Sequence, residues 1–225
     1  MRESNETIPV LLTERLWFPD PRLALNGEHN GLLAFGGDLS VERLRLAYRS
    51  GIFPWTVNPI TWWSPDPRGV FDLNEFHISR SLARTLRQTP FEITRDRDFR
   101  GVISACAQQR RRGNWISVEF TEAYTRLHEA GHAHSVECWQ GGVLAGGVYG
   151  VAVGGLFAGE SMFHRVSDAS KVALHHLIGY LRERGFTLFD TQMVTPVTKA
   201  LGAKEISREE YLQRLASAVR QTCRF

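Results

Sequence analysis

The chain has few cysteines and no obvious export or membrane segment. Cys106, Cys138 and Cys223 are odd in number, widely spaced and without a C-x-x-C pair, so we predict no disulfide framework and interpret them as small core residues. The first ten residues contain Glu3 and Glu6 and no long apolar run. No segment approaches the roughly 18 to 20 apolar residues of a membrane span. These absences predict a cytoplasmic protein without a membrane partner.

Neither sign of charge is present in large excess. The 225 residues carry a formal net charge of only +3, with a pI near 8.9. This balance permits an anionic partner without requiring one, so the placement of the basic residues matters more than their sum. The hydrophobic fraction of 43% is enough to build a core and excludes global disorder.

The glycine-rich stretch lacks the motifs of a phosphate loop. Between Gly141 and Gly159 no two glycines are separated by a single residue, and none precedes Lys-Ser or Lys-Thr. The stretch therefore contains neither G-x-G-x-x-G nor a Walker A motif, and it predicts hairpin turns and close strand packing. Histidine spacing does not favour a metal site either, because His132 and His134 are two apart and His175 and His176 are adjacent.

Prolines and aromatic residues are concentrated in the first 68 residues. One helix is predicted between the proline-rich segments of this part, with Ser40 as its cap and Gly51 at its end. We expect residues 1–68 to form a small, loop-rich N-terminal domain and residues 69–225 to form a larger second one.

The second part shows regular patterns of helix and strand. Helices are predicted for 77–88, from Phe99 to the arginines at 110–112, for 121–130, through the stripe Leu174, Leu177, Ile178 and Leu181, and after a capping box of Ser207 and Glu210. Strands are predicted for 91–94, 135–139, up to Val153, from Leu156 after a Gly154-Gly155 turn, and for 188–193. This order predicts an α+β (mixed α/β) fold around a mainly antiparallel sheet.

Basic residues form a stripe on one predicted helix. Arg80, Arg84 and Arg87 have the spacing i, i+4 and i+7, and Arg110 to Arg112 extend the basic character further along the chain. Such a stripe is typical of a surface that follows a phosphate backbone, although a solvated helix face has the same pattern. Aromatic residues in Phe53–Trp55 and Trp62–Trp63 either fill the core or stack on an unpaired base.

Two polar residues interrupt the predicted strand 188–193. Asp190 and Gln192 lie two apart, which places them on one face of a strand amid apolar neighbours. A buried carboxylate and amide need hydrogen-bond partners, so the pair indicates either a structural network or a reaction centre. Glu160, close to the end of the predicted hairpin, has a similar setting.

Several segments stand in one order along about residues 18–215. They are Gly31–Leu39, Gly51–Trp55, Trp62–Arg68, His77–Ser81, Glu122–Glu129, Gly131–Ser135, Gly159–Phe163 and Asp190–Gln192. Together they resemble one known family, the leucyl/phenylalanyl-tRNA–protein transferases.

This resemblance implies a fold, a reaction and partners. The larger domain is expected to resemble the GNAT acetyltransferase fold. The activity is expected to be transfer of Leu or Phe, and less well Met, from aminoacyl-tRNA to proteins with N-terminal Arg or Lys, which marks the product for degradation under the N-end rule. No metal and no organic cofactor is implied, and a monomer is expected.

The resemblance also implies roles for individual residues. Asp190 and Gln192 resemble the family's catalytic pair. Residues expected at the substrate site are Glu160, Trp55, Trp115, Tyr48, Tyr124, Val148, Leu177 and Leu181. The tRNA-binding cluster is expected to include Arg80, Arg84 and Arg87. Ala83 stands where a further basic residue is expected and Thr195 where Asn is familiar, so the tRNA surface and one hydrogen bond near the site are expected to differ.

Two other classes of function fit part of the pattern. A CoA-dependent N-acyltransferase would share the fold, but the segment His164–Ser170 has none of the glycines of a pyrophosphate loop. A non-catalytic RNA-binding module would explain the arginines and aromatic residues, yet it gives no reason for the pair Asp190 and Gln192.

Overall fold

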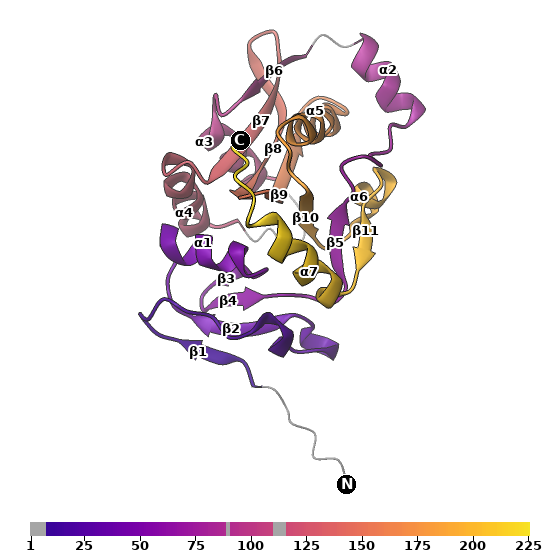
Figure 1. Ribbon diagram of the computed structural model, residues 1–225. Helices are drawn as coiled ribbons and strands as arrows, with labels where there is room; N and C mark the ends of the chain where they lie inside the picture. The colour runs from indigo at the N-terminus through magenta and orange to yellow at the C-terminus, as the bar shows by residue number, and fades with distance from the viewer. Residues whose placement is uncertain (1–7, 89–90, 110–115) are drawn as a thin grey trace.

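The computed structural model describes residues 8–88, 91–109 and 116–225 (Figure 1). Trp115 and Arg110 to Arg112, which the sequence analysis singled out, lie outside the described residues.

The N-terminal part is built on a four-stranded sheet and one helix. The sheet has the order β1-β2-β4-β3, and its pairs are antiparallel except for β1 and β2. Its strands are β1 (Val10–Leu12), β2 (Leu32–Gly36), β3 (Phe53–Val57) and β4 (Ile60–Trp63). Two short 3-10 helices, η1 (Pro21–Leu23) and η2 (Gly27–His29), precede β2. The predicted helix is confirmed as α1 (Val41–Arg49), with the Ser40 hydroxyl accepting from the Arg43 amide and Gly51 following at a φ of 79°.

The rest of the chain forms a seven-stranded sheet. Its order is β11-β5-β10-β9-β8-β7-β6, and all neighbours are antiparallel except β9 and β10. The strands are β5 (Arg68–Phe71), β6 (Glu92–Arg95), β7 (Ala133–Gln140), β8 (Val143–Val153), β9 (Leu156–His164), β10 (Leu188–Gln192) and β11 (Lys204–Ile206). The predicted α+β class with a mainly antiparallel sheet is confirmed.

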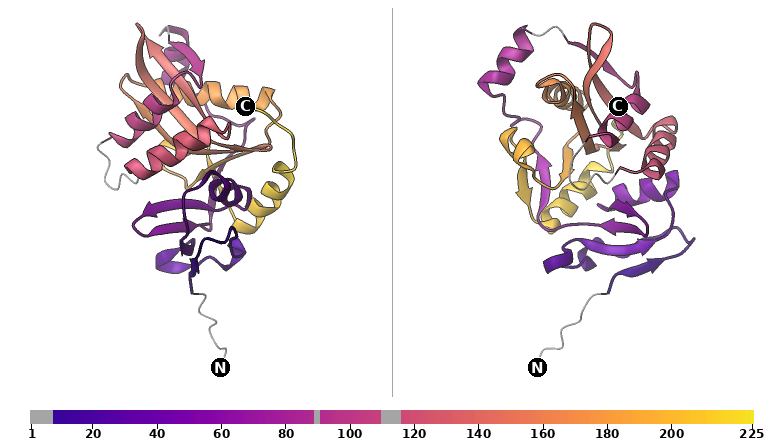
Figure 2. Two further views of the ribbon diagram at one scale, coloured as in Figure 1. Left: turned by 90° about the vertical axis from the view of Figure 1, so that its left-hand side faces the viewer. Right: turned by 180° about the vertical axis from the view of Figure 1, so that it is seen from behind.

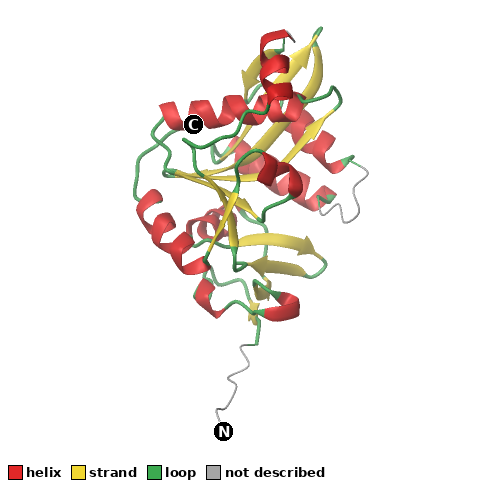
Figure 3. Ribbon diagram, turned by 90° about the vertical axis from the view of Figure 1, so that its right-hand side faces the viewer, coloured by secondary structure: helices red, strands yellow, loops and turns green. Residues whose placement is uncertain are grey.

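Helices cover both faces of this sheet (Figures 2 and 3). On one face, α3 (Phe99–Ala107) and α4 (Val118–Glu129) share a core with α1 and the four-stranded sheet. On the other face, α5 (Ala169–Glu183) packs together with α2 (Arg80–Gln88). Alternation along β8 places Tyr149 in the first core and Val148 in the second. The short α6 (Pro196–Ala200) and the longer α7 (Arg208–Ala218) follow β10 and β11.

Two predicted helix starts are wrong by three residues, and serine caps explain both. The helix predicted from 77 begins at Arg80, because the Ser79 hydroxyl accepts from the Leu82 amide. The helix predicted from 121 begins at Val118, because the Ser117 hydroxyl accepts from the Phe120 amide. The helix predicted to reach the arginines at 110–112 ends as α3 at Ala107. The division at residue 68 stays a prediction; it coincides with the first residue of β5.

Candidate active site

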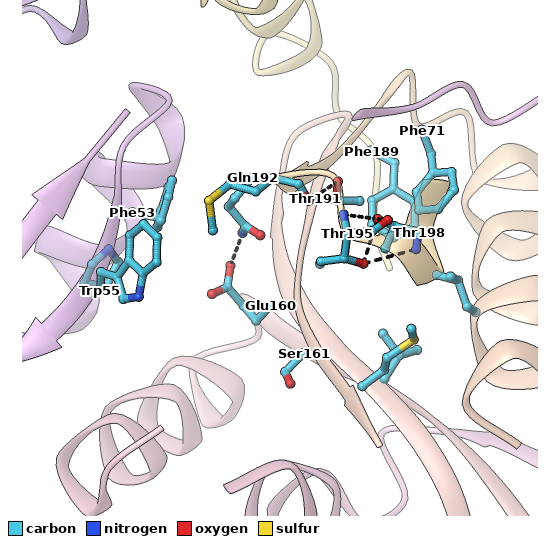
Figure 4. Close-up of a pocket in the computed structure, with 16 residues that line it drawn as sticks. Phe53, Trp55, Phe71, Glu160, Ser161, Phe189, Thr191, Gln192, Thr195 and Thr198 are labelled. Atoms are coloured by element: carbon cyan, nitrogen blue, oxygen red, sulfur yellow. Dashed lines mark hydrogen bonds between the residues drawn. The ribbon is translucent and has the colours of Figure 1, made fainter. Parts of the chain in front are cut away.

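A cavity opens where the two parallel strands of the large sheet separate. The pairing of β9 with β10 ends at Ala158 and Asp190, while β9 continues to His164. The cavity beyond this point has a volume of about 250 Å³ (Figure 4). Its apolar side is formed by Phe71, Val148, Met162, Leu174 and Phe189. Its other residues include Phe53, Trp55, Glu160, Ser161, Thr191, Gln192, Thr195 and Thr198.

Three β-bulges each add one residue to the wall of this cavity. In β9, Gly159 and Ser161 pair with consecutive residues of β8, so Glu160 is the extra residue. The same irregularity makes Thr191 the extra residue in β10 and Trp55 the extra residue in β3. A bulge redirects a side chain that regular alternation would place elsewhere. The sheets therefore direct three chemically different side chains to one place.

Glu160 is held by a set of polar side chains. Its carboxylate accepts a hydrogen bond from the Gln192 amide at 2.8 Å and another from the Tyr124 hydroxyl at 3.2 Å. The Tyr124 hydroxyl also forms a short hydrogen bond with that of Tyr48. Burial is the main cause that raises the pKa of Glu160 to about 8, and the negative charge of Asp190 adds to it, while hydrogen bonds from both tyrosines oppose the shift. Glu160 therefore exchanges a proton near neutral pH.

Asp190 lies behind the cavity in a fully buried network. Its carboxylate accepts from the Arg68 guanidinium at 2.9 and 2.6 Å and from the Tyr211 hydroxyl at 2.8 Å. It also accepts from the backbone N–H of Gln192 at 2.8 Å. Burial is the largest influence on the pKa of Arg68 and lowers it, but the charge of Asp190, the charge of Tyr211 and the hydrogen bond to Asp190 together outweigh burial and raise the net pKa. The carboxylate thus accepts hydrogen bonds from four N–H and O–H groups. Asp190 is not among the residues that line the cavity.

The two residues expected to form a pair are connected through the backbone. Gln192 has a left-handed conformation with a φ of 56°, directly after the bulge at Thr191. The contact that joins them runs from the Asp190 carboxylate to the Gln192 backbone, whereas the Gln192 side chain binds Glu160. β10 ends at Gln192, one residue before the predicted end. Asp190 therefore fixes the peptide of Gln192, and Glu160 fixes its amide.

The other residues expected at the substrate site divide into three groups. Trp55 and Val148 line the cavity, and Trp55 packs edge-on against Trp63 with ring centroids 5.0 Å apart. Tyr48 and Tyr124 are fully buried next to Glu160. Leu177 and Leu181 are buried in the core around α5, where Leu174 is the helix residue that reaches the cavity. Thr195 lines the cavity and caps α6.

The expected basic stripe lies on the surface. Arg80, Arg84 and Arg87 are exposed on α2, and the Arg84 guanidinium donates to Gln88. Leu82, on the opposite side of α2, is fully buried against the α5 core. The stripe is separate from the cavity, since none of the three arginines lines it.

Sequence reasoning missed Arg68 and Tyr211 as partners of Asp190. Arg68 closes the recognised segment Trp62–Arg68, but its partner is 122 residues away. A buried arginine at the start of an apolar strand was the available signal, because such a charge requires a partner. Phe71 and Phe189, which line the cavity from β5 and β10, were also not predicted.

In the described part of the chain, one cluster of possible metal ligands lies away from the cavity. Asp96, His128 and His134 bring one ligand atom each within 4.8 Å of the others. His134 Nδ1 contacts the Asp96 carboxylate at 2.7 Å, and His128 Nδ1 contacts the carbonyl of Ala133 at 2.8 Å. These contacts already occupy the facing nitrogen atoms. Of the two histidine pairs in the sequence pattern, His134 takes part in this cluster, whereas His132, His175 and His176 do not.

Comparisons with known proteins indicate one family over nearly the whole chain. The family profile described as leucyl/phenylalanyl-tRNA protein transferase matches residues 70–216, and the profile of that family's N-terminal domain matches residues 37–66. The chain is 54% identical over 218 residues to a leucyl/phenylalanyl-tRNA–protein transferase of Syntrophobacter fumaroxidans, covering 94% of this chain and 92% of that one. It is 51% identical over 213 residues to the protein of the same name from Methylococcus capsulatus, covering 93% and 90%.

Solved structures give weaker likenesses. L-PGS from Bacillus licheniformis is 13% identical with a TM-score of 0.42, covering 73% of this chain and 53% of that one. A ribosomal-protein-alanine N-acetyltransferase from Brucella melitensis biovar Abortus 2308 is 19% identical with a TM-score of 0.37, covering 49% and 83%. Scores this low support no inference about activity.

Within the described residues, no helix is long and apolar enough to cross a membrane.

Proposed function

The chain belongs to the leucyl/phenylalanyl-tRNA protein transferase family, and from that premise we propose that the cavity beside Glu160 and Gln192 receives the aminoacyl end of a charged tRNA. The enzyme transfers an amino acid from aminoacyl-tRNA to a protein. The observation that carries the assignment is the hydrogen bond between the Gln192 amide and the Glu160 carboxylate at the edge of an apolar cavity.

The transferred amino acid is Leu or Phe, and less well Met. The apolar lining and the small volume favour one uncharged side chain of moderate size. Glu160 is the sole acidic or basic residue among the described residues that line the cavity, and its raised pKa of about 8 leaves it mostly protonated at neutral pH. A positive group beside it would favour the ionised carboxylate and so be bound by it. The α-amino group of the bound aminoacyl ester is such a group. Val148 and Leu174 contact the apolar side chain in this arrangement.

The acceptor is a protein that begins with Arg or Lys. Its N-terminal amine is the nucleophile, and the product then begins with a bulky apolar residue that marks it for degradation under the N-end rule. The tRNA body lies along Arg80, Arg84 and Arg87, which are exposed and can neutralise backbone phosphates. Trp55 packs against the terminal adenosine. The enzyme acts as a monomer in the cytoplasm, where charged tRNA is found.

The reaction is the aminolysis of an ester. The acceptor amine attacks the ester carbonyl, the new C–N bond forms, and the bond between the carbonyl carbon and the ribose oxygen breaks. The proton lost by the amine balances the proton gained by the departing ribose hydroxyl. An N-terminal amine has a pKa of about 8, so much of it is protonated at neutral pH and proton removal is part of the task. Correct placement of amine and ester contributes up to about 7–11 kcal/mol.

The geometry supports different roles for the three polar residues. An amide is too weak a base to take the proton, but the Gln192 carbonyl can accept a hydrogen bond from the amine and so direct its lone pair. The NH₂ group of the Gln192 side chain donates a hydrogen bond to Glu160. The side-chain carbonyl of Gln192 is then available to face the cavity. Asp190 acts as a positioning residue, since it holds the Gln192 backbone and serves Arg68 at the same time.

Transfer of radiolabelled Leu from leucyl-tRNA to a peptide that begins with Arg tests this function. The same peptide beginning with Gly is the acceptor control, and labelled acetyl-CoA replaces leucyl-tRNA as the control for a CoA-dependent acyltransferase. We expect label on the Arg peptide from leucyl-tRNA alone. Absence of label on both peptides, with tRNA still bound, would contradict the proposal and favour a non-catalytic RNA-binding module.

A further inference from the structure

A second and larger cavity lies between α5 and the segment that leads into α2. Its volume is about 610 Å³. Its charged and titratable lining residues are Arg95, His175, His176, Arg182, Glu183 and Arg184. Three guanidinium groups therefore face one carboxylate, which gives the cavity a net positive charge.

Among the residues that the structure describes, the three arginines have no carboxylate partner. None of Arg95, Arg182 and Arg184 takes part in an ion pair among the described residues. The guanidinium groups of Arg95 and Arg184 lie over the ring of Tyr180, at 4.4 and 5.1 Å from its centre. Stacking on one aromatic ring fixes two planar cations in place while their N–H groups stay available.

The neighbouring histidines report the same positive field. Burial is the main cause that lowers the pKa of His175, and the charge of Arg182 adds to it. For His176, burial again comes first, followed by the charges of His175 and Arg95. The pKa of both imidazoles is thus lowered, and an anion in the cavity would oppose the part of the shift that the arginines cause.

The cavity lies close to both the aminoacyl site and the basic stripe. Phe71 lines the first cavity and Phe76 lines the second, with ring centroids 6.0 Å apart. Ile78, two residues before α2, also lines the second cavity. Figure 1 shows α2, α5 and β6 together at the end of the molecule away from the four-stranded sheet. A polyanion bound along α2 with one end in the first cavity passes close to this site.

We propose that the cavity around Tyr180 is a second tRNA contact, in which Arg95 and Arg184 bind a backbone phosphate of the aminoacyl-tRNA. This assignment rests on the proposed function of the first cavity. Arginine forks match the geometry of phosphate oxygens, and each phosphate contact releases counterions and adds to the salt dependence of binding. Arg182 contributes positive charge at the rim of the same site.

The test compares tRNA binding by the double variant Arg95→Ala/Arg184→Ala with the wild type at several salt concentrations. We expect affinity to fall by about tenfold or more, and the slope of log K against log salt concentration to fall by about one, for the one phosphate contact that is lost. Arg126→Ala is the matched control, because Arg126 is an exposed arginine on α4, on the opposite face of the sheet. We expect it to leave both quantities unchanged.

A folding defect is separated from a lost contact by a second variant. Arg95→Gln/Arg184→Gln retains long side chains and removes only the charge, and its thermal unfolding is measured beside that of the wild type. We expect the same loss of tRNA affinity with an unfolding midpoint close to that of the wild type. Unchanged tRNA affinity and an unchanged salt slope in the Gln variant would overturn the proposal.

A small aminoacyl donor separates this proposal from the function of the first cavity. Leucyl-adenosine has an ester but no tRNA body, so we expect the double variant to use it at the wild-type rate while the KM for leucyl-tRNA rises. Failure of the wild type with both donors would overturn the proposed function instead. Inorganic phosphate distinguishes a site for free anions: loss of phosphate binding in the variant with unchanged tRNA binding would overturn the tRNA assignment.

Discussion

Arg68 and Asp190 form a bidentate ion pair across 122 residues of sequence, and each side chain is only 1% exposed. Arg68 also donates to the carbonyl of Gly51 and lies 4.9 Å from the ring centre of Phe53. Asp190 in turn binds the backbone of Gln192. One buried pair therefore links the N-terminal part of the chain to the strand end that carries the candidate reactive amide.

Replacement of Asp190 by Asn should destabilise the protein strongly. The change leaves the Arg68 guanidinium buried without its counterion, which costs about 3–5 kcal/mol. Glu209→Gln is the control, because Glu209 forms an exposed pair with Arg22 and such solvent-screened pairs contribute little to stability. Denaturant unfolding of the two variants measures the difference, and equal losses would show that burial of the pair does not matter.

Replacement of Gln192 by Ala should lower turnover without weakening tRNA binding. The variant loses the group that orients the nucleophile, so we expect kcat to fall by about a hundredfold. Single-turnover transfer and tRNA binding are measured in parallel. An equal loss of rate and affinity would assign Gln192 to tRNA binding and contradict its role at the ester.

Stability should depend on pH through Glu160. Its pKa is raised from 4.5 to about 8 in the folded state, so the folded protein holds the proton longer than the unfolded chain. The free energy of unfolding therefore decreases as pH rises from about 4.5 to 8, and it is unaffected by this group below that window. Glu160→Gln should remove this decrease.

Denaturant unfolding at several pH values between these limits checks the effect. Glu129→Gln changes an exposed glutamate on α4 and serves as the control. A wild type and a Glu160→Gln variant with parallel pH profiles would contradict a raised pKa at this position.

The choice between Leu and Phe should depend on Leu174. Leu174→Ala enlarges the cavity and should raise the ratio of kcat/KM for Phe over Leu, whereas Leu174→Phe fills the cavity and should lower it. Leu177→Ala is the matched control one helical turn further along α5. It should cost about 2–5 kcal/mol of stability through a new void and leave the ratio unchanged. A ratio that follows Leu177 instead would assign the specificity role to that residue.

Features with local causes could be predicted from the sequence. Ser40 and Gly51 bound α1 through a cap and a left-handed glycine, and Gly154-Gly155 forms the turn between β8 and β9. The stripe of Leu174, Leu177, Ile178 and Leu181 correctly indicates a helix that packs through one face. These signals depend only on neighbours within a few residues.

Features that depend on distant packing could not be predicted. Periodicity places Leu174 and Leu177 on one apolar stripe, but only the arrangement of β9, β10 and β5 decides that Leu174 reaches the cavity. Strand alternation predicted that Asp190 and Gln192 share a face, whereas a bulge at Thr191 separates their side-chain partners. An arginine at the start of an apolar strand signals that Arg68 needs a partner, but nothing in the sequence identifies Asp190 as that partner, because chain separation says nothing about proximity in the fold.

The three bulges at Trp55, Glu160 and Thr191 have a consequence for how such a site can diverge. A residue within a regular strand is constrained on both sides, since its neighbours alternate between core and surface. An extra residue is exempt from that repeat, and its side chain can change while the pairing before and after it keeps its register. A substitution at one of these positions therefore changes the side chain offered to the cavity while the register of the surrounding strands stays the same.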